Sequence, residues 1–204
     1  MPELLKTPLE SSRPAQSGKE EGLSRSDGFG GQGLPPQVLS DLRTDHAGEV
    51  GAVCIYQGIL RVSKNPSVRD FAQHHLTTEK NHLRLIESWL PPAHFSRLLP
   101  VWQLAGFITG ALPALFGPRA VYATIKAVET FVDLHYAEQI LALESETSLC
   151  ALRHTLLECQ ADEVAHRCEA AAALGPGKLG LVLSAWCSMV ASGSRFAVAL
   201  CRHV

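Results

Sequence analysis

Hydrophobic and polar positions from Leu34 onward repeat with the 3.6-residue period of amphipathic helices, and the alternation typical of strands is nearly absent. Prolines and glycines separate the periodic segments, as they do where helices begin and end. The pattern predicts six helices, at about 36–63, 67–90, 97–117, 118–143, 147–174 and 179–202. Four of them are amphipathic, and the third and sixth are mostly apolar. We therefore expect an all-α helical bundle.

The first 34 residues lack this period and are rich in Gly, Ser, Pro and Glu. This composition predicts a disordered tail, followed by one domain at 35–204. The tail has no apolar core of a secretory signal, and its acidic residues are unlike a mitochondrial presequence. Within it, "GFGGQG" (28–33) matches G-x-G-x-x-G, but no strand precedes it. We interpret that stretch as a flexible linker and not as a dinucleotide site.

Two stretches of the chain carry no charge, at 98–118 and at 179–194. The first reaches the length of a transmembrane helix, but Pro100, Pro113 and two glycines interrupt it. Two interpretations stay open. The stretches could be buried core helices, or they could form an apolar flap in the membrane interface, which would suit a lipid-soluble substrate.

Composition adds two limits. The formal net charge is −2, with 46% hydrophobic and 19% charged residues, and this excludes the basic surface of a nucleic-acid-binding protein. The six cysteines show no C-x-x-C spacing. We interpret them as small buried hydrophobic residues in a reducing compartment.

Polar residues interrupt the apolar faces of the four amphipathic helices. Two of these faces contain a Glu-x-x-His pair, and each of the other two contains a single inward glutamate. In chain order the six residues are Glu49, Glu79, His82, Glu129, Glu163 and His166. A spacing of three places both side chains of a pair on one side of a helix. One such pair is common without a metal, whereas two pairs, each preceded by an inward glutamate, favour a metal centre.

Burial of four carboxylates in one core would cost several kcal/mol for each unpaired charge, and divalent cations remove that cost. Four carboxylates and two imidazoles are the ligand set of the ferritin-like di-iron or di-manganese carboxylate proteins. Zinc prefers fewer and softer ligands. The sequence therefore predicts a binuclear iron or manganese centre inside a four-helix bundle.

Four motifs resemble the Coq7/Clk-1 family: "LRTDHAGEVGAVCIYQG" (42–58), "EKNHL" (79–83), "AVETFVDLHYAEQI" (127–140) and "DEVAH" (162–166). The resemblance covers about residues 36–204. Members of this family are demethoxyubiquinone hydroxylases, di-iron monooxygenases of ubiquinone biosynthesis. The resemblance implies a ferritin-like four-helix bundle of two helical hairpins, with additional apolar helices at about 97–117 and 179–202.

The resemblance also implies roles for individual residues. One iron would be held by Glu49, Glu79 and His82, and the other by Glu129, Glu163 and His166, with Glu79 and Glu163 bridging. His135 and Tyr136 match the family's catalytic His-Tyr pair near the substrate pocket.

Several of these roles have a structural alternative. Tyr136 could be core packing, and His135 a hydrogen-bonded histidine. Asp45, His46 and Asp162 could orient ligands or bond to helix ends. Asp133 departs from the family pattern, in which a neutral residue is expected.

The activity implied is hydroxylation of the ring of a demethoxyubiquinol with an isoprenoid tail, with O₂ as oxidant and two iron ions as cofactor. Electrons would come from a separate reductase, from the quinol itself or from NADH. The resemblance implies a peripheral membrane protein, with other quinone-biosynthesis proteins as partners. We expect the cytoplasmic side of a bacterial cell membrane in preference to the mitochondrial inner membrane. Two rivals are another ferritin-like role, iron storage or peroxide removal, and a metal-free lipid-binding scaffold of a quinone-synthesis complex.

Overall fold

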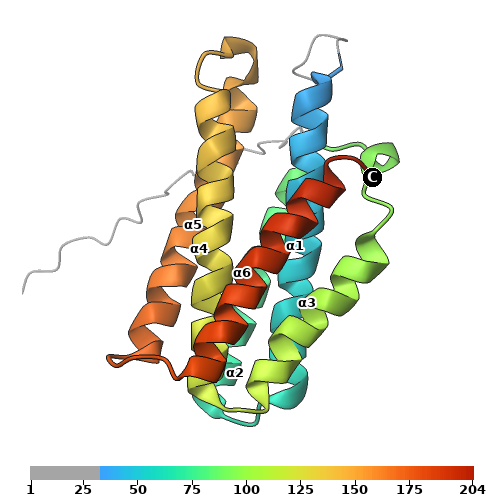
Figure 1. Ribbon diagram of the computed structural model, residues 1–204. Coiled ribbons are helices and arrows are strands. Elements are labelled where there is room, and N and C mark those ends of the chain that lie inside the picture. The colour runs from blue at the N-terminus through green and yellow to red at the C-terminus, as the bar shows by residue number, and fades with distance from the viewer. Residues whose placement is uncertain (1–32) are drawn as a thin grey trace, which may run out of the picture.

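A computed structural model describes residues 33–204, so the predicted tail except its last two residues, and all but the last glycine of "GFGGQG", lie outside the described residues. The described part contains six α-helices and no strand, which confirms the all-α class (Figure 1). The helices are α1 (Pro36–Val62), α2 (Pro66–Glu87), α3 (Leu99–Ala114), α4 (Pro118–Ala142), α5 (Cys150–Leu174) and α6 (Leu181–Cys201). Single 3₁₀ turns, η2 (Pro92–His94) and η3 (Thr147–Leu149), precede α3 and α5.

The helix ends follow from local chemistry. Asn65 caps α2 by accepting a hydrogen bond from the backbone N–H of Val68 at 3.1 Å, and Pro66 occupies the first turn. Gly117 has a φ of 95°, which lets the chain reverse between α3 and α4. The second helix ends three residues earlier than predicted, at Glu87. The third ends at Ala114, three residues earlier than predicted, and Pro113 lies inside its last turn.

Helices α1, α2, α4 and α5 form a four-helix bundle of two hairpins, α1–α2 and α4–α5 (Figure 1). Helix α3 packs mainly on α1, and α6 packs mainly on α4. Both lie on the near side of the bundle in Figure 1. The predicted ferritin-like arrangement with two additional apolar helices is confirmed.

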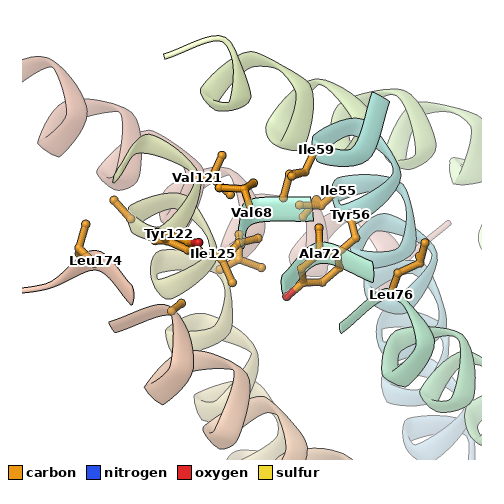
Figure 2. Packing of buried hydrophobic residues seen from close by; sticks show 13 residues of the cluster. Ile55, Tyr56, Ile59, Val68, Ala72, Leu76, Val121, Tyr122, Ile125 and Leu174 are labelled. Atoms are coloured by element: carbon orange, nitrogen blue, oxygen red, sulfur yellow. The ribbon is translucent and has the colours of Figure 1, made fainter. Parts of the chain in front are cut away.

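The core of the bundle has two apolar clusters, one toward each end. Figure 2 shows the first, in which Ile55 and Ile59 of α1 lie near Val68 of α2 and Ile125 of α4. The second cluster contains residues from the other ends of the same four helices, among them Leu42, Ile86, Ile140 and Leu152. The six predicted metal ligands lie between the two clusters along each helix. Apolar packing on both sides therefore holds a polar layer in the middle of the bundle.

Helix α3 approaches α1 so closely that the two backbones touch. A Cβ added at Gly110 would lie 1.9 Å from the carbonyl oxygen of Ile55, and one added at Gly106 would lie 2.4 Å from that of Gly51. A Cβ added at Gly58 of α1 would lie 2.3 Å from the carbonyl oxygen of Phe107. Only glycine allows this approach. Helix α3 is thus fixed against α1 by backbone contact and does not rest on it loosely.

Gly110→Ala is expected to lower the free energy of unfolding by about 1–3 kcal/mol or more, because the added methyl group must push two helices apart. Gly193→Ala in α6 is the matched control, since no atom lies within 4 Å of the added Cβ. That change should be neutral or stabilise by up to about 1 kcal/mol. Urea unfolding followed by circular dichroism measures both, and equal effects would contradict the close contact.

The apolar helices are not buried, so the interpretation of both stretches as core helices is wrong. Only Gly106, Gly110 and Pro113 of α3 and Cys201 of α6 are buried. Large side chains at the α3 and α6 ends point outward, with Phe116 77% and Leu181 91% exposed. Each helix lies against one side of the bundle, and nothing in residues 33–204 covers its outer face. By length and composition, α6 is the one described helix that could cross a membrane.

The six cysteines, all within the described residues, are free. Cys159 and Cys201 are buried, as expected of small hydrophobic residues. Cys150 and Cys168 are exposed, so the interpretation is wrong for these two. They lie on α5, where helical periodicity turns them outward.

Candidate metal centre

The four bundle helices bring the six predicted residues into one cluster. Each of their side chains is buried, with a residue exposure of 1–3%. Their ligand atoms form two groups, and within each group the atoms lie within 4.8 Å of one another. One group is Glu49, Glu79, His82 and Glu163, and the other is Glu79, Glu129, Glu163 and His166. Glu79 and Glu163 belong to both groups, which is the position of bridging carboxylates.

In the two Glu-x-x-His pairs, each histidine lies closer to the glutamate of the other pair than to its own. His82 Nδ1 lies 3.1 Å from Glu163 Oε1 but 3.8 Å from Glu79 Oε2 on its own helix. His166 Nδ1 lies 3.1 Å from Glu79 Oε1 and 3.4 Å from Glu163 Oε2. Each imidazole is therefore nearer to the glutamate of the other pair. The two shared carboxylates lie between the two imidazoles.

Several buried atoms of this cluster have no hydrogen-bond partner within residues 33–204. They are Glu49 Oε2, Glu79 Oε1, His82 Nδ1, Glu163 Oε2 and His166 Nδ1. Buried polar atoms in proteins are nearly always paired, and an unpaired one costs about 1–3 kcal/mol. Lone pairs that converge in this way fit two cations, which would satisfy all five atoms at once.

The pKa values of the clustered side chains also indicate that positive charge is favoured between the glutamates. Burial raises the pKa of Glu49 to about 7, and burial together with neighbouring carboxylates raises the pKa values of Glu79 and Glu129 well above their usual range. Burial would also raise the pKa of Glu163, but the two imidazoles outweigh it and lower that pKa to about 2. Burial lowers the pKa of His82, yet the carboxylates around it raise it to about 9.

Two tyrosines bind the outer glutamates reciprocally. Tyr56 of α1 donates to Glu129 Oε1 of α4 at 3.0 Å, and Tyr136 of α4 donates to Glu49 Oε1 of α1 at 2.5 Å. Both tyrosines are buried. Tyr56 was not among the residues predicted from the sequence to support the metal ligands. A usable signal was present, because each helix repeats a glutamate followed by a tyrosine seven positions later.

Of the other candidate residues, one contacts the six-residue cluster and two do not. Asp162 contacts the cluster, since His82 Nε2 lies 3.0 Å from its Oδ2. His46 does not, because its Nε2 faces Glu87 at 3.4 Å and its ring stacks on Phe95. Asp133, the departure from the family pattern, pairs with Arg167 and accepts from Gln160, both on α5. Its charge is thus neutralised outside the cluster.

His135 takes part in a buried network at the edge of the cluster. Its Nε2 lies 3.0 Å from Thr44 Oγ1 and 3.1 Å from Asp45 Oδ1. Gln139, one turn later on α4, donates to the same Asp45 oxygen at 2.6 Å. His135 is therefore a hydrogen-bonded histidine, and it also lines a pocket beside the glutamates.

His75 is a further buried histidine that the sequence analysis missed. Its ring packs edge-on against His166, with centroids 4.1 Å apart. Its Nε2 lies 3.1 Å from Glu169 Oε2, without the angles of a hydrogen bond. Burial lowers the pKa of His75 to about 3, so its ring is neutral. The sequence does contain a sign of its position, because His75 precedes Glu79 by one helical turn and so faces the same side of α2.

A cavity of about 390 Å³ lies between α1, α3, α4 and α6, and its lining is predominantly apolar. A smaller cavity of about 40 Å³ reaches Glu49, Glu79, Glu129 and Glu163. Residues of α1, α4 and α6 line both cavities, namely Thr44, Gly48, Ala52, Phe131, Val132 and Val198. An apolar ligand held between the outer helices would therefore lie next to the carboxylate cluster.

Comparison with known proteins agrees with this geometry. A family model described as "Ubiquinone biosynthesis protein COQ7" matches residues 37–201. The chain belongs to the COQ7 family. The six clustered residues, His135 and Tyr136 all lie within the matched range.

Individual COQ7-family relatives are similar over part of their length. The 3-demethoxyubiquinol 3-hydroxylase of Rhodospirillum rubrum is 36% identical over 137 residues, which cover 65% of this chain and 64% of the relative. The mitochondrial NADPH-dependent 3-demethoxyubiquinone 3-hydroxylase of Dictyostelium discoideum is 34% identical over 65% of this chain and 63% of the relative. Its human counterpart is 36% identical over 52% and 49%. This chain thus spans less than two thirds of the curated relatives it matches.

Proposed function

We propose that this COQ7-family chain is a di-iron monooxygenase that hydroxylates the ring of a demethoxyubiquinol in ubiquinone biosynthesis, with O₂ as oxidant. The observation that carries the proposal is the contact between the apolar cavity and the carboxylate cluster. The hydroxylase names of the relatives support the same reaction. One oxygen atom of O₂ would enter the ring and the other would leave as water, so two electrons and two protons are required.

The chain offers a complete ligand set for two irons. Glu49, Glu79 and His82 would hold one ion, and Glu129, Glu163 and His166 the other, with Glu79 and Glu163 shared. Bound iron would supply the reduction of O₂, for which protein side chains have no suitable chemistry. Storage or peroxide removal gives no reason for the apolar cavity, and a metal-free scaffold gives none for the unpaired buried ligand atoms.

The remaining residues would bind and orient the substrate. The apolar walls of the larger cavity would hold the isoprenoid chain and exclude water from the ring. His135 and Tyr136 line the smaller cavity, where the ring would meet the metal centre. Tyr136 would also fix the orientation of Glu49 through their hydrogen bond. Both residues therefore remain our proposed catalytic pair.

The exposed apolar faces of α3 and α6 support a peripheral position on a membrane. A substrate could then pass from the bilayer into the cavity between these helices without crossing water. The cytoplasmic side of a bacterial cell membrane stays our prediction, although several eukaryotic relatives are named as mitochondrial. The electron donor would be a reductase, NADH or the quinol, and other quinone-biosynthesis proteins would be partners.

The test is isotope incorporation by the protein reconstituted with Fe(II), a short-chain demethoxyubiquinol and a reductant. Under ¹⁸O₂ the product should gain one labelled oxygen atom, and the protein should carry close to two irons per chain. A product labelled from water, or oxidation of iron without hydroxylation, would favour the rival roles.

The reciprocal tyrosines provide a second test. Tyr56→Phe and Tyr136→Phe are each expected to weaken iron binding about 10- to 100-fold, because each removes one hydrogen bond to an outer ligand. Tyr122→Phe is the matched control, since Tyr122 is buried on α4 but packs against Phe71 away from the cluster. Iron titration measures all three. Equal affinity in every variant would show that these hydrogen bonds do not support the ligands.

A further inference from the structure

Asp45 carries an unpaired oxygen beside the candidate metal centre. It lies on α1, one turn before Glu49, and its side chain is fully buried. Its Oδ1 accepts hydrogen bonds from Gln139 at 2.6 Å and from His135 at 3.1 Å. Its Oδ2 has no hydrogen-bond partner among residues 33–204. Asp45 neither caps a helix end nor contacts one of the six clustered side chains, so the earlier alternatives do not account for it.

A buried carboxylate oxygen without a donor is costly, because carboxylates bind water strongly before burial. Asp45 lines the smaller cavity together with the four glutamates. The missing partner is therefore expected in that cavity. Asp45 is not one of the clustered metal ligands, so a ligand that donates a hydrogen bond would satisfy its Oδ2.

The side chains next to Asp45 also determine which kind of ligand group fits there. The Thr44 hydroxyl donates to the backbone carbonyl of Asp41 at 2.6 Å, so its oxygen can accept from His135 Nε2 at 3.0 Å. This assignment places the imidazole proton on Nε2, where Thr44 Oγ1 and Asp45 Oδ1 share it, and it makes Nδ1 the accepting nitrogen. The Gln139 amide nitrogen lies 2.9 Å from the same Nε2, because both nitrogens point at Asp45 Oδ1. Gln139 directs its amide N–H groups toward Asp45. This corner of the pocket thus offers acceptors.

We propose that Asp45 Oδ2 accepts a hydrogen bond from a ring hydroxyl of the substrate and so orients the ring against the metal centre. The assignment of the ring rests on the proposed function. A hydroquinone has two ring hydroxyl groups that donate, whereas the corresponding quinone has only accepting carbonyl oxygens. Asp45 therefore selects the reduced form of the substrate. Gln139 is a positioning residue, since its hydrogen bond holds the inner oxygen and leaves the other oxygen directed at the ligand.

The substitution Asp45→Asn tests this role with almost no change of shape. Two donors surround the inner oxygen position, so the amide oxygen must stay there and the NH₂ group takes the place of Oδ2. An acceptor is thereby replaced by a donor. The variant should lose its preference for the hydroquinone and should bind the quinone more tightly than the wild type does.

The measurement is anaerobic equilibrium dialysis of iron-loaded protein with three probes: a short-chain demethoxyubiquinol, its dimethyl ether and its quinone. The wild type should bind the quinol at least about 10-fold more tightly than either other probe, as expected for a hydrogen bond to a charged group. Asp45→Asn should lower that ratio to about one while keeping the wild-type iron content. Asp70→Asn on the exposed surface of α2 is the control and should keep the ratio.

Two results would overturn the inference. One is a folded, iron-loaded Asp45→Asn protein that still prefers the quinol. The other is a wild type that binds all three probes equally. This result would overturn the inference even if the variant fails to fold. The proposed function fails separately, through absence of ¹⁸O incorporation by the wild type. A wild type that prefers the quinol through Asp45 but does not hydroxylate it would support the role of Asp45 and contradict the proposed reaction.

Discussion

Glu163→Gln is expected to lose bound iron and hydroxylation together. The Glu163 carboxylate lies between both imidazoles, at 3.1 Å from His82 and 3.4 Å from His166, and belongs to both ligand groups. A neutral amide offers one oxygen in place of two and no negative charge, so it binds two cations much more weakly than a carboxylate does. Residues that only support metal ligands are worth about 10- to 100-fold in affinity, and a shared ligand should exceed that range. Iron content should fall from close to two per chain to below one.

Glutamine has nearly the same shape as glutamate, so the variant is expected to fold as the wild type does. Glu158→Gln is the control, because Glu158 lies on the same helix with its side chain exposed and pairs only with His154. Iron analysis and hydroxylation are measured on both variants, with circular dichroism as a check of helix content. Two irons or full activity in Glu163→Gln would refute the ligand role. A loss in Glu158→Gln of equal size would point to a general effect of removing charge from α5.

Phe116→Asp combined with Leu181→Asp is expected to release the protein from phospholipid vesicles. Phe116 is 77% exposed in the turn just after α3, and Leu181 is 91% exposed at the first residue of α6. Both ends lie at the bottom of Figure 1. A large apolar side chain gains about 1.5–3 kcal/mol on leaving water, so each charge should weaken binding at least about 10-fold. Cosedimentation with vesicles measures the loss.

Leu141→Asp provides the control for this second test. Leu141 is also exposed, at 69%, but it lies at the C-terminal end of α4, at the opposite end of the bundle (Figure 1). That variant should bind vesicles as the wild type does. If both proteins lose binding equally, general surface hydrophobicity accounts for it. If neither does, the apolar faces of α3 and α6 serve another partner.

Iron binding and membrane binding should be separable by these variants. The carboxylate layer lies between two apolar clusters in the bundle core, whereas the exposed side chains lie on α3 and α6 outside it. Phe116→Asp with Leu181→Asp should therefore retain close to two irons. Its turnover of a short-chain, water-soluble quinol should also persist, because that substrate need not pass through a bilayer. Loss of iron in this variant would show that the outer helices stabilise the metal layer.

The reasons for success and failure of the sequence analysis differ between elements. Helices and inward-facing ligands follow from periodicity, because a 3.6-residue repeat places Glu79 and His82 on the same side as the leucines around them. Periodicity cannot say whether a helix that is apolar on all sides is buried or exposed, so the sequence left both interpretations open for α3 and α6, and the structure excludes the buried one. Asp133 looked anomalous only until its partner Arg167, more than thirty positions away, was placed beside it.

By itself the sequence determined the six helices, the polar layer in their middle and the identity of the six residues that converge there. Each of these depends on spacing along one helix or on the burial cost of a charge. Tertiary structure alone decided that Tyr56 and Tyr136 bind the glutamates of opposite helices and that α3 touches α1 through glycine. It also decided that one oxygen of Asp45 has no hydrogen-bond partner in the described part of the chain. These contacts depend on how helices distant in sequence are rotated and spaced, because a hydrogen bond or a backbone contact changes within an ångström.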